Sequence, residues 1–516
     1  MGFLTALLLV FVLLCVALVR AVRRRRARPP YPPGPPADPL IGHIRIMPST
    51  DNAHEVFHDW AQQYGDVMSL DVLGTRYVIL NSAEAATDLL EKRNSKYADR
   101  PTFPMYERVG WKDTLVFLPY GPYFRKQRKM LQLPLGEGES HRLPTHRGAR
   151  DVRNALHIMS DPDNTDAFVH RYTTAVTMEL AYGHRVVSND DEYLKAADMV
   201  IDVLRSVTRP SLLDVSPIFE YLPAWFPGAW FVKCIKEIKP VVLREIQHPV
   251  SVVQQELMAG TAKPSFVSQQ LEDLSRESGL SQEDLYTVSM VAHQIFGGGS
   301  ETGWHTIMTF IACMLTNPDV QRKGEEELDS VVGRGRLPDF TDRDSLPYID
   351  CIVKETMRWQ PVVPLSVPHK AMEDDEYRGM HIPKGATIIP NARSITWDER
   401  HFHEPRTYKP ERFLPRPQGA GEDFPQGAVF GWGRRLCPGR YLADDVVWLA
   451  IARILAVFDI QKAVDADGNV VEPHIEFTTV LTSHPKPFPC SLRPRSEKAA
   501  ELVRQAYDMH MANVAV

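Results

Sequence analysis

The segment Phe430-Gly431-Trp432-Gly433-Arg434-Arg435-Leu436-Cys437-Pro438-Gly439 decides how the rest of the chain is interpreted. It places one cysteine in a loop between Gly433 and Gly439, and glycines permit tight turns and close approaches that a side chain would obstruct. Nearby amides and the charge of Arg435 favour the thiolate of Cys437 over the thiol. The segment therefore predicts a thiolate held against a flat ligand. A buried, inert cysteine in a glycine-rich turn is the alternative.

Five residues of this segment match, position for position, the haem-binding signature of the cytochrome P450 superfamily: Phe430, Gly433, Arg435, Cys437 and Gly439. The chain thus resembles that family, and the resemblance implies haem b with Cys437 as the axial ligand of the iron. Thiolate ligation of haem iron favours cleavage of the O–O bond. The resemblance also implies a mainly α fold with small β-sheets, the family's triangular helical prism, behind an N-terminal transmembrane helix.

The composition is ordinary for a globular protein, with 516 residues, 44% apolar and 24% charged residues and a formal net charge of −6. This charge gives no reason to expect a nucleic acid as partner. The six cysteines, at positions 15, 234, 313, 351, 437 and 490, form no CxxC pair and favour reduced thiols facing the cytosol. No flavin or glycine-rich dinucleotide motif is present. Electrons from NADPH would therefore arrive through a separate flavoprotein reductase, as the resemblance implies.

The N-terminus predicts a membrane anchor. Phe3 to Val19 is apolar apart from Thr5 and, as a helix, is long enough for ~26 Å of hydrocarbon. Arginines follow the apolar run, whereas a cleaved signal peptide, the alternative, carries its charge before it. The positive-inside rule then places the remaining chain in the cytosol. We expect a single-pass anchor in an endoplasmic-reticulum-type membrane.

The chain after the apolar run divides into a hinge, a catalytic domain and a tail. Pro29 to Pro36 is rich in proline and predicts a stiff, extended spacer, with a disordered linker as the alternative. The tail has helical character and no function that we can assign. The predicted divisions are an anchor at 1–22, a basic and proline-rich hinge at 23–36, a haem-thiolate monooxygenase domain at 37–495 and a tail at 496–516.

Two β-hairpins are predicted among mostly helical periodicity. Val67 to Leu73 and Arg76 to Leu80 are β-favouring runs joined through Gly74-Thr75. Tyr377 to Pro390 predicts another hairpin that turns near Pro383-Lys384-Gly385.

The longest predicted helix begins at Ser281, whose side chain can cap it, and runs to Thr316, roughly 54 Å at helical rise. Its middle contains four glycines, which together cost several kcal/mol at about 1 kcal/mol each. Either another helix packs closely there, or a flat ligand and dioxygen lie against a locally widened helix. By resemblance, Glu301 and Thr302 are the acid–alcohol pair that supplies protons, which is general-acid catalysis. Gly303 departs from the family, where a second hydroxyl residue is common.

Glu355 and Arg358 are spaced i, i+3 on one predicted helix face. The spacing alone is weak evidence, because Glu501 and Arg504 share it. By resemblance, however, the first pair lies where the family's structural pair belongs, and Arg412 matches the third member. We expect these three to form a charge-assisted network behind the haem, without a catalytic role.

Four cationic residues are expected to contact the haem propionates. Tyr120 to Lys129 resembles the family's propionate-binding helix, with Phe124 in place of the usual tryptophan. By resemblance, the four contacts are Arg128, Arg435, His369 and Arg100. A solvated surface position is the alternative for each.

Two surface segments suggest partners. Arg125, Lys126 and Lys129 form a basic cluster that, by resemblance, faces an acidic reductase, and a plain solvated face is the alternative. Ile218 to Phe231 is crowded with aromatic residues and, by resemblance, dips into the lipid bilayer. Core packing is the alternative for this second segment.

The predicted function is insertion of one oxygen atom of O2 into a hydrophobic small molecule. Fungal secondary metabolism is the nearest resemblance, so terpenoids, aromatics and polyketides are candidate substrates. The rival functions are a haem-thiolate isomerase or dehydratase and a non-catalytic haem sensor or carrier. By alignment to the family, the substrate-facing segments are Pro104–Leu118, Ala292–Gly298, Val363–Val367 and Thr479–Ser483, and they are mainly apolar. His293, within the second of these, is predicted to be a packed or hydrogen-bonding residue.

Overall fold

The fold is known from a computed structural model, which describes residues 29–49, 51–136, 164–186, 190–208, 211–215, 217–277, 279–465, 467–479 and 481–514. The predicted anchor at 1–22 lies outside these residues. Within them, every helix is too short or too polar to cross a membrane. The five cysteines in these ranges are all free thiols.

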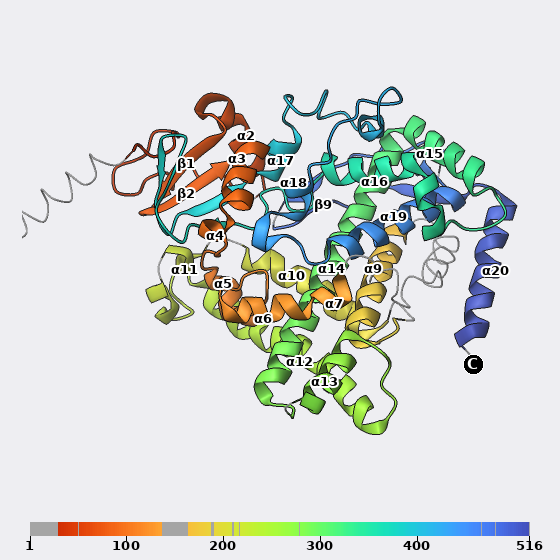
Figure 1. The fold of residues 1–516 in the computed structure, drawn as a ribbon, viewed down its shortest axis with the longest axis horizontal. Helices are drawn as coiled ribbons and strands as arrows, with labels where there is room; N and C mark the ends of the chain where they lie inside the picture. The colour runs from red at the N-terminus through yellow and green to blue at the C-terminus, as the bar shows by residue number, and fades with distance from the viewer. Residues whose placement is uncertain are drawn as a thin grey trace, which may run out of the picture.

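The described chain is mainly helical with small sheets, which confirms that part of the predicted fold class (Figure 1). The longer helices are α2 Ala53–Tyr64, α6 Pro122–Met130, α9 Thr165–Tyr182, α10 Glu192–Val207, α12 Trp230–Ala259, α13 Phe266–Glu277, α14 Gln282–Thr316, α15 Pro318–Val331, α16 Pro347–Trp359, α19 Arg440–Val457 and α20 Glu497–Val514. The short helices are α3 Ala83–Ala86, α4 Asn94–Tyr97, α5 Pro104–Tyr106, α7 Gln132–Leu135, α11 Leu212–Val215, α17 Ala392–Thr396 and α18 Gln426–Phe430. The tighter or wider turns are η1 Thr87–Lys92, η2 Glu107–Trp111, η6 Pro217–Tyr221, η7 Phe340–Ser345, η8 Pro410–Phe413 and η9 Gly433–Arg435.

Helix α14 passes through the middle of the molecule and contacts α9, α12, α16 and α19 (Figure 1). Ser281 caps it by accepting a hydrogen bond from the amide of Asp284, as predicted, and the helix ends at Thr316. Its second half, after Gly303, is almost entirely buried. α14 is α-helical without interruption, so the expected local widening is not observed.

The largest sheet has the strand order β1-β2-β6-β3. β1 Val67–Val72 and β2 Thr75–Leu80 form the first predicted hairpin, with antiparallel pairing. The remaining sheets have two strands each: β4 Asp375–Tyr377 with β5 Met380–Ile382, β7 Phe458–Lys462 with β10 Cys490–Pro494, and β8 Phe477–Thr479 with β9 Ser483–Pro485.

The second predicted hairpin, Tyr377 to Pro390, is wrong. Gly385 does turn the chain, with a φ of 85°. However, β5 pairs back to β4 through the tight turn Arg378-Gly379. β6 Thr387–Pro390 instead pairs in parallel with β2 and antiparallel with β3 His369–Lys370. β6 is buried along its whole length. Its backbone therefore forms hydrogen bonds with β2 and β3, which lie on either side of it, and not with β5, the strand before it in the sequence.

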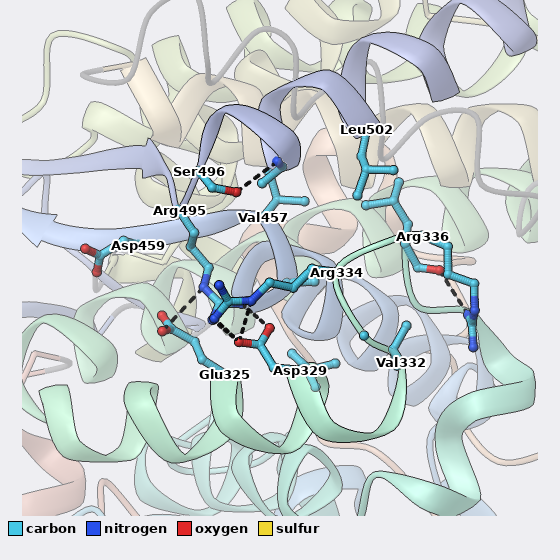
Figure 2. Close-up of a pocket in the computed structure, with 15 residues that line it drawn as sticks. Glu325, Asp329, Val332, Arg334, Arg336, Val457, Asp459, Arg495, Ser496 and Leu502 are labelled. Carbon is cyan, nitrogen blue, oxygen red and sulfur yellow. Dashed lines mark hydrogen bonds and ion pairs between the residues drawn. The ribbon is translucent and has the colours of Figure 1, made fainter.

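The C-terminal tail forms α20, which packs against α19 and β10. Arg495, just before the helix, pairs with Asp329 at 2.8 Å and with Glu325 at 3.5 Å, and Figure 2 shows it pointing between the two carboxylates. Ser496 caps the helix by accepting from the amide of Ala499. A pocket of about 220 Å³ lies beside these ion pairs, and its lining comes from the region of α15, α19, β7 and α20.

Candidate functional site

The loop that carries Cys437 lies between η9 and α19. The amide of Cys437 donates to the carbonyl of Phe430 at 2.8 Å, which folds the loop back on itself. Gly433 has a φ of 55°, and a Cβ there would lie 2.4 Å from the carbonyl oxygen of Leu90. This glycine therefore serves close packing against η1. Gly439 has a φ of −90° and faces open space, where a Cβ would meet no atom within 4 Å. A flat ligand has room at this second glycine.

The surroundings of the Cys437 thiol suit a metal ligand. Burial raises the pKa of the thiol above its ordinary value, whereas a hydrogen bond from the Gly439 amide and the charges of Arg128 and Arg440 lower it. Coordination to iron deprotonates a thiol, and these same groups then stabilise the thiolate. The positive charge expected from Arg435 comes instead from Arg128 and Arg440.

Arg435 is buried and fixed by the backbone. Its guanidinium donates to the carbonyls of Ala98 and Leu118, each at 2.7 Å. It also lies 3.9 Å from the ring centre of Phe124. Phe124, which replaces the family's usual tryptophan, thus packs the face of its ring against the guanidinium of Arg435.

Arg100 and His369 are also buried and anchored to the backbone. Arg100 donates to the carbonyls of Val367 and Pro368 at 2.7 and 2.8 Å. Nδ1 of His369 lies 2.8 Å from the carbonyl of Tyr97. Because a carbonyl only accepts, Nδ1 carries the proton and Nε2 of the neutral ring is an acceptor. A propionate at Nε2 would therefore require the imidazolium form.

Arg100, Arg128 and Arg435 form one cationic cluster, and the neutral ring of His369 lies beside it. Burial and the charge of Arg435 lower the pKa of Arg100, and burial and the charge of Arg100 lower that of His369. Burial lowers the pKa of Arg435 to about 10, with Asp99 opposing and Arg128 adding to this shift. Arg128 makes no hydrogen bond or ion pair with any residue that the structure describes. This surplus of positive charge fits the two carboxylates of haem.

The middle of α14 presents an open face. Gly298 is exposed although its helix crosses the core, and a Cβ there would meet only Nε2 of the Gln294 side chain, at 2.9 Å. One turn further on, Oγ1 of Thr302 donates to the Gly298 carbonyl at 2.8 Å. Glu301 accepts a hydrogen bond from Oγ1 of Thr482 at 2.7 Å. The two members of the predicted acid–alcohol pair thus have different partners, and Thr482, on the turn between β8 and β9, is a contact that the sequence did not predict.

The glycines of α14 serve two purposes. A Cβ at Gly299 would lie 2.7 Å from the Thr177 methyl group, and one at Gly303 would lie 3.2 Å from that of Thr173. These two glycines allow α9 to pack closely, which was the structural alternative. Gly298 instead lies on the open face, which is consistent with the functional interpretation.

The structure brings Glu355, Arg358 and Arg412 together. Glu355 accepts from Nε and Nη2 of Arg358 at 2.7 and 2.8 Å and from Nε of Arg412 at 3.1 Å. All three side chains are buried, with exposures of 0%, 0% and 1%. Arg412 also pairs at 2.8 Å with Glu422, a fourth member that no sequence motif indicated.

A cluster of apolar side chains includes residues of two of the four predicted substrate-facing segments, Pro104–Leu118 and Thr479–Ser483. Residues of η2 and the following loop pack with α10, α12 and the first half of α14. The members of this cluster include Tyr106, Trp111, Phe117, Val203, Phe231 and Met290. Leu481, from the turn between β8 and β9, packs against it. The side chains that pack together in this region are therefore mainly apolar.

Comparison with known proteins places the chain among haem-thiolate enzymes. The cytochrome P450 family model matches residues 32–489. Cytochrome P450 monooxygenase 208 of Postia placenta is 38% identical over 474 residues, which is 91% of each chain. A cytochrome P450 monooxygenase of Armillaria gallica is 37% identical over 475 residues, 90% of this chain and 92% of the relative. Cytochrome P450 monooxygenase claR of Ampulloclitocybe clavipes is 34% identical over 483 residues, 92% and 88% of the two chains.

Proposed function

The chain belongs to the cytochrome P450 family of monooxygenases, and we propose that it inserts one oxygen atom of O2 into an apolar small molecule. Electrons come from NADPH through a separate flavoprotein reductase. The substrate is a terpenoid, aromatic or polyketide-like compound of secondary metabolism, a proposal supported by the apolar cluster and by the fungal relatives.

One observation carries this proposal: a buried thiol beside an amide and two arginines that would favour its thiolate once it is deprotonated, together with a cationic cluster that has more positive charge than its described partners neutralise. Haem b supplies an iron for the thiolate and two carboxylates for the cations. When bound, it provides the activation of dioxygen that protein side chains lack.

The roles of the chain's own residues follow from their positions. Cys437 would bind the haem iron through its sulfur, and the cationic cluster would hold the haem carboxylates. Oγ1 of Thr302 carries a proton beside the open face of α14, and the carboxylate of Glu301 can accept a proton and pass it on. Thr482 fixes the orientation of Glu301. Phe430, Gly433 and Gly439 shape the loop that holds the cysteine.

The basic cluster of α6 supports docking of an acidic reductase. Arg125, Lys126 and Lys129 are all exposed on one short helix. Lys126 makes one long ion pair, 3.3 Å to Asp284, and the rest of the positive charge faces solvent. Exposed charge of one sign steers an oppositely charged partner into transient complexes.

Exposed apolar residues support attachment to an endoplasmic-reticulum-type membrane, with the single-pass anchor at 1–22 and the catalytic domain in the cytosol. Ile218, Tyr221 and Trp225 are 68%, 86% and 81% exposed, whereas Phe231 is buried, so only part of the aromatic segment packs in the core. A second apolar group, at Leu40, Ile41, Ile44 and Ile46, lies beside β1. In Figure 1, β1 and α11, which precedes the first group, lie toward the same side of the molecule. Two such patches suit a lipid surface.

The spectrum of the reduced, carbon-monoxide-bound protein tests the haem assignment. We expect a thiolate-type spectrum, and Cys437→Ser should abolish it. An imidazole-type spectrum, or a thiolate-type spectrum that survives the substitution, would refute the assignment. NADPH consumption and oxygen uptake with a reductase and a substrate panel then test monooxygenation. A haem-thiolate isomerase or a haem sensor would show the spectrum without substrate-dependent consumption of NADPH.

A further inference from the structure

Glu245 and His293 form a buried polar pair that the proposed reaction does not use. Glu245 lies on α12 and His293 on α14, and their side chains are 9% and 6% exposed. Nδ1 of His293 and Oε1 of Glu245 are 3.7 Å apart, too far for a hydrogen bond. Neither atom has a hydrogen-bond partner in the described chain. Each such buried group in a folded protein calls for an explanation.

Two further polar groups at this place also have no partner. Trp111, on η2, stacks over the His293 ring with 6.3 Å between ring centres, and its indole N–H is buried and unpaired. The hydroxyl of Tyr182, at the end of α9, is likewise buried and unpaired. Tyr182 is close enough to Glu245 for the carboxyl charge to add to the effect of burial in raising the tyrosine pKa. Four elements therefore each place an unsatisfied polar atom in one small region.

The region borders the open face of α14. A Cβ at Gly297 would meet only Cε1 of His293, at 3.9 Å, so the space beside Gly297 is otherwise open and the buried histidine ring lies at its border. The next residue, Gly298, is the exposed glycine beside Thr302. Trp111 belongs to the apolar cluster on the same side of α14. The polar pair thus lies between the open space beside Gly297 and the apolar cluster that contains Trp111.

The chemistry of the four groups selects a neutral ligand. Burial raises the pKa of Glu245 to about 8 and lowers that of His293 to about 4, so both are uncharged near neutral pH. Burial is the only influence on the pKa of either group, and no cation of the described chain lowers the pKa of the Glu245 carboxyl. A protonated carboxyl and an indole N–H donate hydrogen bonds, while the unprotonated imidazole nitrogen accepts one. A hydroxyl or carbonyl oxygen satisfies such donors without bringing in a charge.

We propose that Glu245, His293, Trp111 and Tyr182 form a binding site for a neutral oxygen, occupied by water in the free enzyme and by a hydroxyl or carbonyl of the substrate in the complex. This proposal rests on the proposed function and narrows the substrate class to apolar molecules that already carry an oxygen. The reaction that supplies this substrate must therefore leave an alcohol or ketone on the skeleton. A cationic amine is the competing ligand, because it would pair with an ionised Glu245.

The binding test uses probes that share one skeleton: p-menthane, menthol and menthone, with trimethyl(decyl)ammonium as an amine-type cation. Affinities for the haem-loaded full chain are measured by calorimetry. The ratio of menthol to p-menthane affinity should fall about two- to tenfold in the double variant Glu245→Leu/His293→Leu, the equivalent of one net hydrogen bond. Glu245→Gln keeps the hydrogen-bonding capacity and should retain the ratio. Ser289→Ala is the matched control, because Ser289 is a buried α14 hydroxyl that already donates to Leu285.

An unchanged ratio in the double variant would overturn the substrate role, and preferential binding of the ammonium probe would assign the site to amines. If no probe of the menthane series binds, the apolar-substrate part of the proposed function fails. A crystal structure of the substrate-free enzyme then tests the oxygen-binding site independently of the substrate class. Water within about 3.2 Å of both Glu245 and His293 supports it, and a direct bond between the two side chains refutes it.

Discussion

Replacing Glu355 with glutamine should destabilise the fold strongly. The carboxylate accepts from Arg358 at 2.7 and 2.8 Å, from Arg412 at 3.1 Å and from the amide of Lys409 at 2.8 Å. Glutamine removes the negative charge and points an N–H donor at guanidinium groups that only donate. Breaking one partner out of a buried ion-pair network costs about 3–5 kcal/mol. Because Glu422 still pairs with Arg412, we expect the lower half of this range.

The chain supplies a matched control for this substitution. Glu501 and Arg504, on α20, have the same i, i+3 spacing and an ion-pair distance of 3.0 Å, but their side chains are 51% and 47% exposed. Exposed ion pairs add little to stability because water screens them. Glu501→Gln should therefore unfold at the same urea concentration as the wild-type chain.

The assay is equilibrium unfolding in urea of the haem-loaded chain, followed by tryptophan fluorescence and by the thiolate-type spectrum. Glu355→Gln should lower the midpoint in both signals, because the network ties α16 to the segment that leads toward the cysteine loop. A midpoint equal to that of Glu501→Gln would refute the reasoning, since burial would then have no influence on the energy of the pair. Loss of the thiolate spectrum with unchanged fluorescence would assign the network to haem binding alone.

Three further predictions concern the site. Arg128→Gln should speed transfer of haem to apomyoglobin, because the guanidinium of Arg128, which has no partner among the described residues, would be lost as a haem contact. Arg125→Gln, on the exposed face of the same helix, should not change the rate, and equal transfer rates for the two variants would remove Arg128 from the cationic cluster. Thr482→Val should lower the amount of product formed per NADPH by about two- to tenfold, which is the equivalent of losing one hydrogen bond to Glu301. Thr482→Ser keeps the hydroxyl and should retain the wild-type yield. A low yield in the serine variant would mean that Thr482 acts only through packing. From pH 6 to pH 8 the free energy of unfolding of the wild type should fall by about 2 kcal/mol more than that of Glu245→Gln. In the folded protein Glu245 has a pKa of about 8 and keeps its proton over most of this range, whereas the carboxyl of the unfolded chain has already released it. Urea unfolding at each pH measures this difference, and His293 and Tyr182 are the titratable groups that face the carboxyl; parallel pH profiles for the two proteins would contradict the prediction.

Local signals in the sequence predicted local structure well. Ser281 and Asp284 mark the start of α14 because a capping interaction involves residues only three apart. The turn of the β1–β2 hairpin is equally local. The interpretation of Tyr377 to Pro390 was wrong because β6 pairs with β2, some 300 residues earlier in the chain. A turn signal at Gly385 shows where the chain bends, but not which strand it meets afterwards.

Single glycines show the same limit of prediction from sequence. Gly299 and Gly303 are determined by methyl groups on α9, and Gly433 by a carbonyl on η1, all far away in sequence. The motif located these glycines correctly but could not name the atoms that require them. Conversely, the exposure of Gly298 and the open space beside Gly439 are visible only once the chain is folded. Within one motif, packing and ligand binding can therefore be separated only in three dimensions.

Two buried glutamates make the distinction between structure and function concrete. Both lie on helices, Glu355 on α16 and Glu245 on α12, and only the first belongs to a recognisable motif. Glu355 is surrounded by donors, so its burial is compensated within the chain. Glu245 faces an imidazole beyond hydrogen-bond reach and no cation, so its burial is not compensated. Within the part of the chain that the structure describes, one buried carboxyl is left unpaired while the other is fully hydrogen-bonded, so the unpaired one is suited to a ligand. That contrast, rather than the family motif, points to an oxygen-bearing substrate.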